Sequence, residues 1–353
     1  MPLDRSRIPA EALAILRRGA VIPAHPLALT AERRLDQRRQ RALTRYYLDA
    51  GAGGLAVGVH TTQFAIREVG LYEPVLRLAA ETAASWTDRP LIMIAGLAGR
   101  TAQAVSEAQI AVGLGYHAGL LSLAALRGAS EDELVEHCQR VAQEIPLIGF
   151  YLQTAVGGLP LAASFWRRFG AIENAIAIKL APFNRYRTID VIRGIVEARA
   201  EDHLTLYTGN DDHIVLDLLC PFVVRRGEEQ LVVRIRGGLL GHWSVWTRAA
   251  VKLLERIHRA IESGTVDDAL LGLDSRVTDC NAAVFDAAND FHGVIAGCHE
   301  VLRRQGLLEG IWCLDPNETL GPGQAEEITR VTRSHPELTD DDFVRAHLER
   351  WLS

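Results

Sequence analysis

Asn174-Ala-Ile-Ala-Ile-Lys-Leu-Ala-Pro182 is the stretch that decides the fold of this chain. A short apolar run that is rich in isoleucine and bounded by Asn and Pro predicts a β-strand buried on both faces, as in a parallel sheet. The single charged residue of the run, Lys179, stands near its end. The sequence therefore predicts a lysine that water barely reaches.

The lysine content makes this position stand out. The chain has 38 lysine and arginine residues, but only two of them, Lys179 and Lys252, are lysines. Arginine stays protonated, whereas a desolvated lysine can lose its proton and attack a carbonyl group. Two interpretations follow: Lys179 is a nucleophile, or it is a structural lysine that extends toward solvent or pairs with a carboxylate.

Length and composition favour a globular enzyme built on one barrel. A chain of 353 residues suits a single α/β barrel with extensions. Hydrophobic residues make up 48% and charged residues 23%, and the net charge of −6 argues against a nucleic-acid or anionic-membrane partner.

The cysteine pattern and the length of the apolar segments argue against disulfide-rich, zinc-cluster and membrane-spanning proteins. The five cysteines are scattered and include no Cys-x-x-Cys pair, so the sequence indicates neither a disulfide framework nor a zinc cluster. No window reaches about 18 uninterrupted apolar residues, and the N-terminus lacks a long apolar segment after its charges. We therefore expect a cytoplasmic protein.

Strand and helix patterns alternate along most of the chain. After a leading helix at 9–18, the predicted strands are 20–29, 53–59, 90–97, 117–123, 146–152, 174–182, 204–208 and one within 231–240. The predicted helices that follow them are 31–50, 73–85, 101–114, 131–144, 161–169, 188–200, 212–219 and 245–261.

Eight such units most simply close into a (β/α)8 TIM barrel, at residues 19–265. We disfavour an open doubly wound sheet because Gly51, Gly53 and Gly54 precede a strand, which is the wrong context for a dinucleotide-binding turn. Residues 1–18 are predicted to be a helical lead-in. Residues 266–353 no longer alternate and predict a C-terminal helical extension, with helices at 281–305, 324–334 and 340–352.

Polar residues follow the predicted strands at the end where barrel enzymes carry their chemistry. They form a rim around Lys179 and comprise His25, His60, Thr61, Thr62, Tyr151, Gln153, Gly209, Asn210, Asp211, Asp212, His213, Gly241, His242 and Trp243.

A Schiff base is the first chemistry that suits this rim. Lys179 would condense with a 2-oxo acid, and the iminium would act as an electron sink for making or breaking a bond. Tyr151, on the neighbouring strand, would be the proton shuttle, and Thr61 and Thr62 offer hydroxyls for a carboxylate. Each has a structural alternative, since Tyr151 can be a core aromatic and a Thr-Thr pair an ordinary loop.

A metal site is the second chemistry. Three histidines and a carboxylate are a sufficient ligand set for zinc or a similar ion, and His25, His60, His213 and His242 with Asp211 or Asp212 supply the residue types. No His-x-His or Glu-x-x-His spacing fixes two ligands locally, and Asn210 to Asp212 can equally cap a helix.

The chain also resembles the dihydrodipicolinate synthase and N-acetylneuraminate lyase family of class I aldolase-type barrels. The resemblance rests on five segments in order: Gly19-Ala-Val-Ile-Pro-Ala, Gly54-Leu-Ala-Val-Gly with His60-Thr61-Thr62, Pro146-Leu-Ile-Gly-Phe-Tyr151, Ile176-Ala-Ile-Lys179 and Tyr207-Thr-Gly-Asn-Asp211. It implies that Lys179 forms the Schiff base, that Tyr151 is the catalytic tyrosine, and that the protein forms dimers or tetramers.

The sequence departs from the family at several loops. The Gly-Glu expected after Thr61-Thr62 is missing, and Tyr151 is followed by Leu-Gln-Thr-Ala-Val-Gly in place of Asn-x-Pro. Leu123-Ala-Ala-Leu replaces the Pro-Tyr-Tyr that supplies a tyrosine across the subunit contact of the synthase. These departures indicate that the mechanism is kept and the substrate is different.

The sequence therefore predicts a Schiff-base-forming lyase, of aldolase or hydro-lyase type and without a cofactor, that acts on pyruvate or another small 2-oxo acid. Lys179 is the predicted nucleophile and Tyr151 the proton shuttle. The predicted substrate-binding residues are Thr61, Thr62, His25, His60, Gly209, Asn210, Asp211 and His242. Two alternatives stay open: a metal-dependent barrel hydrolase or aldolase, and a barrel that binds a keto acid without catalysis.

Overall fold

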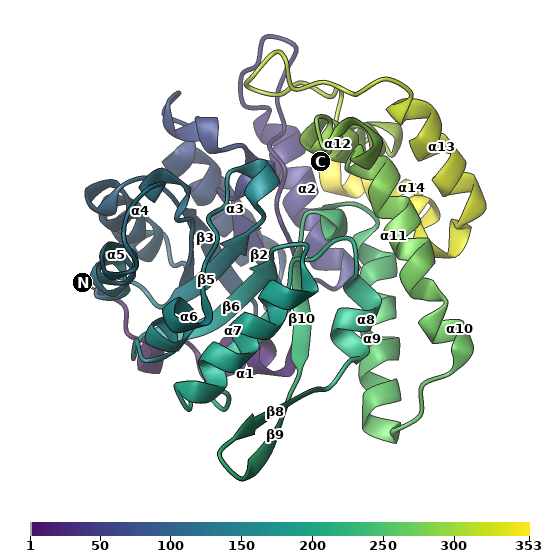
Figure 1. Cartoon of the computed structure of the whole chain (residues 1–353). Coiled ribbons are helices and arrows are strands. Elements are labelled where there is room, and N and C mark those ends of the chain that lie inside the picture. The colour runs from purple at the N-terminus through teal and green to yellow at the C-terminus, as the bar shows by residue number, and fades with distance from the viewer. Residues whose placement is uncertain (1) are drawn as a thin grey trace.

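Eight parallel strands form the centre of the computed structural model, which describes residues 2–353 (Figure 1). The strands are β1 Val21–Pro23, β2 Gly54–Val57, β3 Ile92–Leu97, β4 Ala118–Leu121, β5 Leu147–Leu152, β6 Ala175–Ala181, β7 Thr205–Thr208 and β10 Ile235–Leu240. They are hydrogen-bonded in the order β1-β10-β7-β6-β5-β4-β3-β2, and a parallel bridge between Ala24 and Ala56 joins the two outer strands. The predicted (β/α)8 barrel is confirmed.

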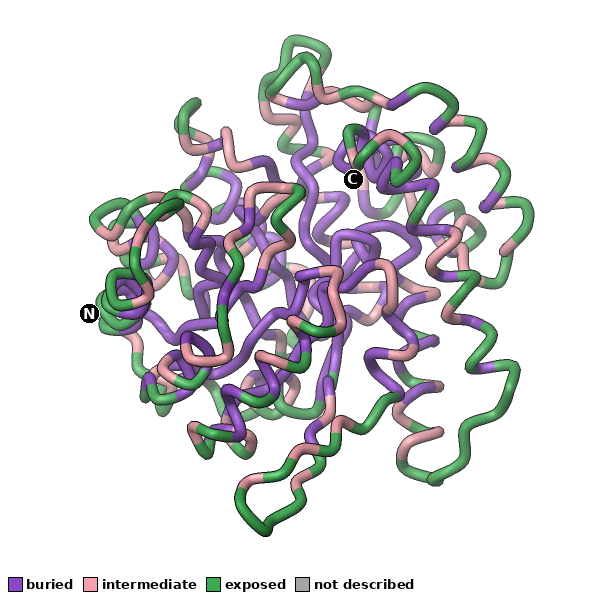
Figure 2. The backbone as a smooth tube through the Cα atoms, viewed as in Figure 1, coloured by how far each residue is buried: buried purple, intermediate pink, exposed green. Residues whose placement is uncertain are grey.

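Helices follow the strands and surround the barrel. They are α2 Gln37–Ala50, α3 Tyr72–Trp86, α4 Thr101–Gly113, α5 Glu131–Ala142, α6 Ala163–Gly170, α7 Arg185–Glu197, α8 Ile214–Leu219 and α9 Thr247–Ser263. Residues with a 3.6-residue apolar period bury one stripe of each helix against the strands. The strands run through the buried centre of the molecule, as Figure 2 shows.

Side chains of the strands divide between two hydrophobic clusters, because neighbouring residues in a strand point to opposite faces. One cluster fills the barrel interior and includes Ile94, Ile148 and Phe150, whereas the other lies between the barrel and its helices and includes Leu180. Helix α1, Ala10–Arg18, adds Leu16 to the interior cluster. The Tyr207 hydroxyl donates to the Leu16 carbonyl at 2.8 Å, so α1 closes one end of the barrel.

Two stretches differ from the sequence prediction. The strand predicted within 231–240 is β10, but the sequence did not predict the antiparallel hairpin of β8, Phe222–Arg226, and β9, Glu229–Val233, that precedes it. Gly227, in its two-residue turn, has the positive φ of 62° that such tight turns require. The hairpin projects away from the C-terminal helices in Figure 1.

The predicted helix at 281–305 is wrong, because the chain breaks between α11, Leu273–Val284, and α12, Val294–Arg304. Asp286, Asp290 and Phe291 have positive φ values in this break. Aspartate tolerates the left-handed conformation better than most residues, which explains a turn where helical periodicity predicts continuity.

The C-terminal extension is helical, as predicted, and packs on the barrel. Its other helices are α10 Asp268–Leu271, α13 Gln324–Ser334 and α14 Asp341–Leu352. Helix α14 lies against α2, where Trp351 packs on Tyr46 with ring centroids 5.4 Å apart and donates to Asp49 at 2.7 Å. Among residues 2–353, the structure contains no helix that is long and apolar enough to cross a membrane.

Candidate active site

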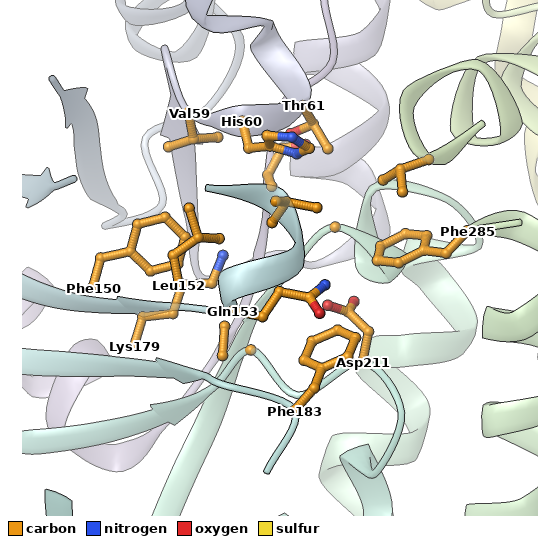
Figure 3. Close-up of a pocket in the computed structure, with 16 residues that line it drawn as sticks. Val59, His60, Thr61, Phe150, Leu152, Gln153, Lys179, Phe183, Asp211 and Phe285 are labelled. Atoms are coloured by element: carbon orange, nitrogen blue, oxygen red, sulfur yellow. The ribbon is translucent and has the colours of Figure 1, made fainter. Parts of the chain in front are cut away.

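A small pocket opens at the carboxyl ends of the strands, with Lys179 projecting into it (Figure 3). Its free volume is about 50 Å³. Its lining comes from segments spread along the chain and consists of Ala24, Val59, His60, Thr61, Phe150, Leu152, Gln153, Val156, Lys179, Ala181, Phe183, Gly209, Asp211, Gly241, Phe285 and Val294. Most of these side chains are apolar, so a charge inside the pocket is poorly solvated.

Lys179 is held in the pocket by close packing. Only 7% of the residue is exposed, and its amine lies 4.5 Å from the centre of the Phe150 ring. A Cβ atom at Gly209 would come within 2.6 Å of the lysine Cε, so only glycine leaves room for the side chain there. Burial lowers the pKa of Lys179 to about 8, and the charge of Asp211 offsets part of this effect. The side chain therefore supplies neutral amine near neutral pH.

Strand alternation explains which residues bury the amine. Ile178 and Leu180, which flank Lys179, belong to the outer cluster and point toward the helices. The groups next to the lysine side chain are instead Phe150 on β5 and Gly209 after β7.

Asp211 is the carboxylate that lines the pocket. Its Oδ1 accepts the backbone N–H of His242 at 2.9 Å, and the residue is 5% exposed. Burial raises the pKa of Asp211 to about 7, although this hydrogen bond and the Lys179 charge oppose the rise. Within residues 2–353, no direct ion pair of 4.0 Å or less joins the two groups. Each group therefore affects the pKa of the other without a direct ion pair.

Tyr151 does not face Lys179. Phe150, the preceding residue, is the one paired in register with Lys179, so the Tyr151 side chain points to the opposite face of β5. There it packs on Trp166 of α6, its hydroxyl donates to the Leu161 carbonyl at 3.0 Å, and it accepts from Arg187 at 2.9 Å. The expectation that Tyr151 shuttles protons for Lys179 is corrected on this geometry.

The segment after β2 contributes His60 and Thr61 but not Thr62. The Thr61 hydroxyl donates to the Ala24 carbonyl at 2.7 Å, and the Thr62 hydroxyl donates to the His25 carbonyl at 2.7 Å. Thr62 also accepts from the backbone N–H of Gly58 at 2.9 Å, so it holds the turn together. Burial and the Lys179 charge lower the pKa of His60 to about 4, which keeps its imidazole neutral.

Three other predicted binding residues lie outside the pocket. His25 points toward α2, with its Nε2 2.8 Å from the Thr44 hydroxyl. Asn210 accepts from the backbone of Phe183 at 2.9 Å and thereby positions a wall of the pocket, while His242 contributes its backbone N–H and packs its ring against Trp246.

The histidines considered as metal ligands are not brought together. His213 pairs with Asp274 at 3.3 Å, while His25 and His242 are engaged outside the pocket and His60 lies in it. Across residues 2–353, no group of three or more His, Cys, Asp or Glu side chains is placed to hold a metal ion. The structure therefore offers no ligand cluster for the metal interpretation.

Sequence reasoning missed the apolar walls of the pocket. Phe150, Leu152 and Phe183 come from the ends of β5 and β6, while Phe285 and Val294 come from the C-terminal extension (Figure 3). Phe150 was passed over in favour of its neighbour Tyr151, which points to the other face of β5. The last two carry no local signal, because they reach the pocket from about a hundred residues further along the chain.

Comparison with known protein families gives a match over most of the chain. The model of the dihydrodipicolinate synthetase family matches residues 18–333. The chain belongs to this family. None of the curated proteins compared with the chain matches it.

Solved structures of the family share the fold. A prophage protein of the dihydrodipicolinic acid synthase family from E. coli, YagE in complex with pyruvate, has a TM-score of 0.73 at 18% identity, covering 90% of this chain and 98% of its own. CdNal from Clostridium difficile, in complex with mannosamine, has a TM-score of 0.71 at 15% identity, with the same coverage. A monomeric dihydrodipicolinate synthase variant has a TM-score of 0.73 at 15% identity and covers 91% of this chain and 98% of its own. Membership of the family supports a class I aldolase-type lyase.

Proposed function

We propose that this protein is a Schiff-base-forming lyase that acts on pyruvate or another small 2-oxo acid, with Lys179 as the nucleophile. The observation that carries the proposal is the buried Lys179 amine, whose pKa is lowered to about 8 in a pocket at the carboxyl end of the barrel. A neutral amine adds to a ketone, and the resulting iminium withdraws electrons from the bond that is made or broken.

The pocket restricts the size and polarity of the substrate. Its free volume of about 50 Å³ suits a compact molecule, since a water molecule needs at least roughly 10 Å³ on this measure. No arginine is among the lining residues, and Phe150, Phe183 and Phe285 form apolar walls. A 2-oxo acid with a short or apolar substituent fits these walls better than a polyhydroxylated sugar acid.

His60 and Thr61 are the proposed contacts for the substrate carboxylate. Both line the pocket with Lys179. The Thr61 hydroxyl must release the Ala24 carbonyl before it can donate to the substrate, since a hydroxyl has one proton to give.

Borohydride trapping tests the proposal. The protein is incubated with each of a panel of 2-oxo acids and reduced with borohydride, and its mass is then measured by intact-protein mass spectrometry. We expect a single adduct on the wild type, none on Lys179→Ala, and a full adduct on Lys252→Ala, because Lys252 is exposed on α9. A wild type that gives no adduct with any 2-oxo acid would reject the proposal.

A keto-acid-binding protein without catalytic activity is the second candidate. It is favoured by Phe150, because the residue that faces the amine has no hydroxyl to move protons. Such a protein would bind pyruvate in calorimetry without forming the reduced adduct or turning over substrate.

We also propose that the protein forms a dimer or tetramer. Tyr186 is 81% exposed and Ile189 44% exposed on α7, so this helix offers two apolar side chains that a partner subunit would cover. Sedimentation velocity on the wild type and on a Tyr186→Lys variant tests this. A wild type that sediments as a monomer at micromolar concentration would contradict the expectation.

A further inference from the structure

The pocket raises a question about proton transfer. Making an imine requires an acid to help water leave, and using the imine as an electron sink requires a base to remove a proton from the neighbouring carbon. The residue that faces the Lys179 amine, Phe150, can do neither. Another side chain of the pocket must therefore take both tasks if the proposed lyase function is correct.

The lining contains two candidates besides the lysine itself. His60 and Asp211 are its other titratable side chains, whereas Thr61 and Gln153 do not titrate in the neutral range. Lys179 and Asp211 both project into the pocket in Figure 3. The hydrogen bond from the His242 backbone fixes one carboxyl oxygen of Asp211.

Charge decides between the two candidates. The iminium is a permanent cation in an apolar pocket. If His60 accepted a proton, a second cation would form beside it, at a position where the Lys179 charge already opposes protonation. If Asp211 accepted a proton, it would turn from an anion into a neutral acid, and in its ionised form it offsets the iminium charge.

We propose that Asp211 is the acid–base residue of this site, where it donates the proton that expels water and then accepts the proton from C3 of the bound 2-oxo acid. This proposal rests on the proposed lyase function. Lys179 and Asp211 both line the same pocket of about 50 Å³, so a 2-oxo acid joined to the amine is held beside the carboxyl.

Imine formation and then enamine formation are the two steps, and each conserves atoms and charge. The Lys179 nitrogen forms a bond to C2 and the C2–oxygen bond breaks. One hydrogen of the water comes from the amine and the other from protonated Asp211, which becomes a carboxylate. That carboxylate then removes a proton from C3, the C3–H electron pair forms the enamine double bond, and the C=N π electrons return to nitrogen. Asp211 ends protonated, as it began. The raised pKa of Asp211, about 7, allows both forms near neutral pH.

Exchange of the C3 hydrogens tests the assignment. Pyruvate is incubated with enzyme in deuterated water, and loss of the methyl proton signal is followed by NMR while adducts are trapped in parallel with borohydride. We expect Asp211→Asn still to reach the adduct on Lys179, but more slowly because water leaves without its acid, and to lose at least about a hundredfold in exchange rate. Asparagine keeps an oxygen for the His242 N–H, and the adduct itself shows that the site is folded.

A matched control and a second variant complete the design. Asp212→Asn removes the neighbouring carboxylate, which pairs with Arg185 and does not line the pocket, and should exchange at the wild-type rate. Asp211→Ser is a second variant that removes the carboxyl group without introducing the amide of Asp211→Asn. Exchange at the wild-type rate in both Asp211 variants would overturn the proposal. So would exchange that is lost in His60→Gln and kept in Asp211→Asn. A wild type that forms no adduct would instead refute the lyase function on which it rests.

Discussion

Replacing Lys179 by methionine measures how much the buried amine lowers the free energy of unfolding. Burial moves the pKa of this amine from its ordinary value of 10.5 to about 8. One pKa unit corresponds to about 1.4 kcal/mol, so the protonated lysine costs the folded state roughly 3 kcal/mol at neutral pH. Methionine has a similar length and imperfect packing costs up to about 1.5 kcal/mol. We expect Lys179→Met to raise the free energy of unfolding by about 1 to 3 kcal/mol at pH 7.

The stability gain from Lys179→Met should depend on pH, whereas a change in packing alone would not make it do so. Because the pKa of Lys179 is lower in the folded than in the unfolded state, the cost is fully present below about pH 8 and is relieved as the pH rises toward 10.5. The gain from Lys179→Met should therefore shrink at pH 10. Urea unfolding at both pH values measures it, with exposed Lys252→Met as the matched control. A Lys179→Met variant no more stable than the wild type at pH 7, or a gain that grows with pH, would refute this reasoning.

Three further predictions follow from the geometry. The rate at which acetic anhydride acetylates the Lys179 amine should rise with pH through about 8, and Asp211→Asn should lower this apparent pKa, because the Asp211 charge raises the pKa of Lys179. An unchanged apparent pKa in a pH series of labelling rates would count against their coupling. Arg67→Met should destabilise the protein by about 3 to 5 kcal/mol in urea unfolding, because it leaves Glu107 buried without its 2.9 Å partner, and a loss below about 1 kcal/mol would contradict this. Phe285→Ala should open the pocket, so that steady-state trapping favours 2-oxo acids with longer side chains; an unchanged preference would show that Phe285 does not limit substrate size.

The barrel was predictable because its signal is local and repeated. Strand β6 is an apolar run interrupted only by Lys179, and the alternation of such runs with amphipathic segments leaves few topologies. The hairpin β8–β9 was not predictable in the same way, since only Arg234 separates the apolar end of β9 from Ile235 of β10, and the two segments look like one strand. The break between α11 and α12 depends on aspartates that adopt a left-handed backbone, which helical periodicity does not reveal.

Some residues of the site could likewise be predicted from local sequence, whereas the position of others depends on long-range contacts. Lys179, Asp211, Thr61 and His60 line one pocket, because strand ends converge in a barrel. Tyr151 was misplaced because Phe150 and Tyr151 differ by one residue, and one residue moves a side chain to the other face of the sheet. The register of β5 and β6 also shifts between Leu147 and Ile148, so parity could not be counted from the start of the strand.

The central claim, that Lys179 forms an imine with a 2-oxo acid, is tested most directly by locating the adduct. The wild-type protein is incubated with pyruvate, reduced with borohydride, digested, and sequenced by tandem mass spectrometry. The account predicts a reductive adduct on the peptide that contains Lys179 and an unmodified peptide around Lys252, the only other lysine. An adduct on Lys252 with Lys179 unmodified, under conditions in which the protein is folded, would contradict it.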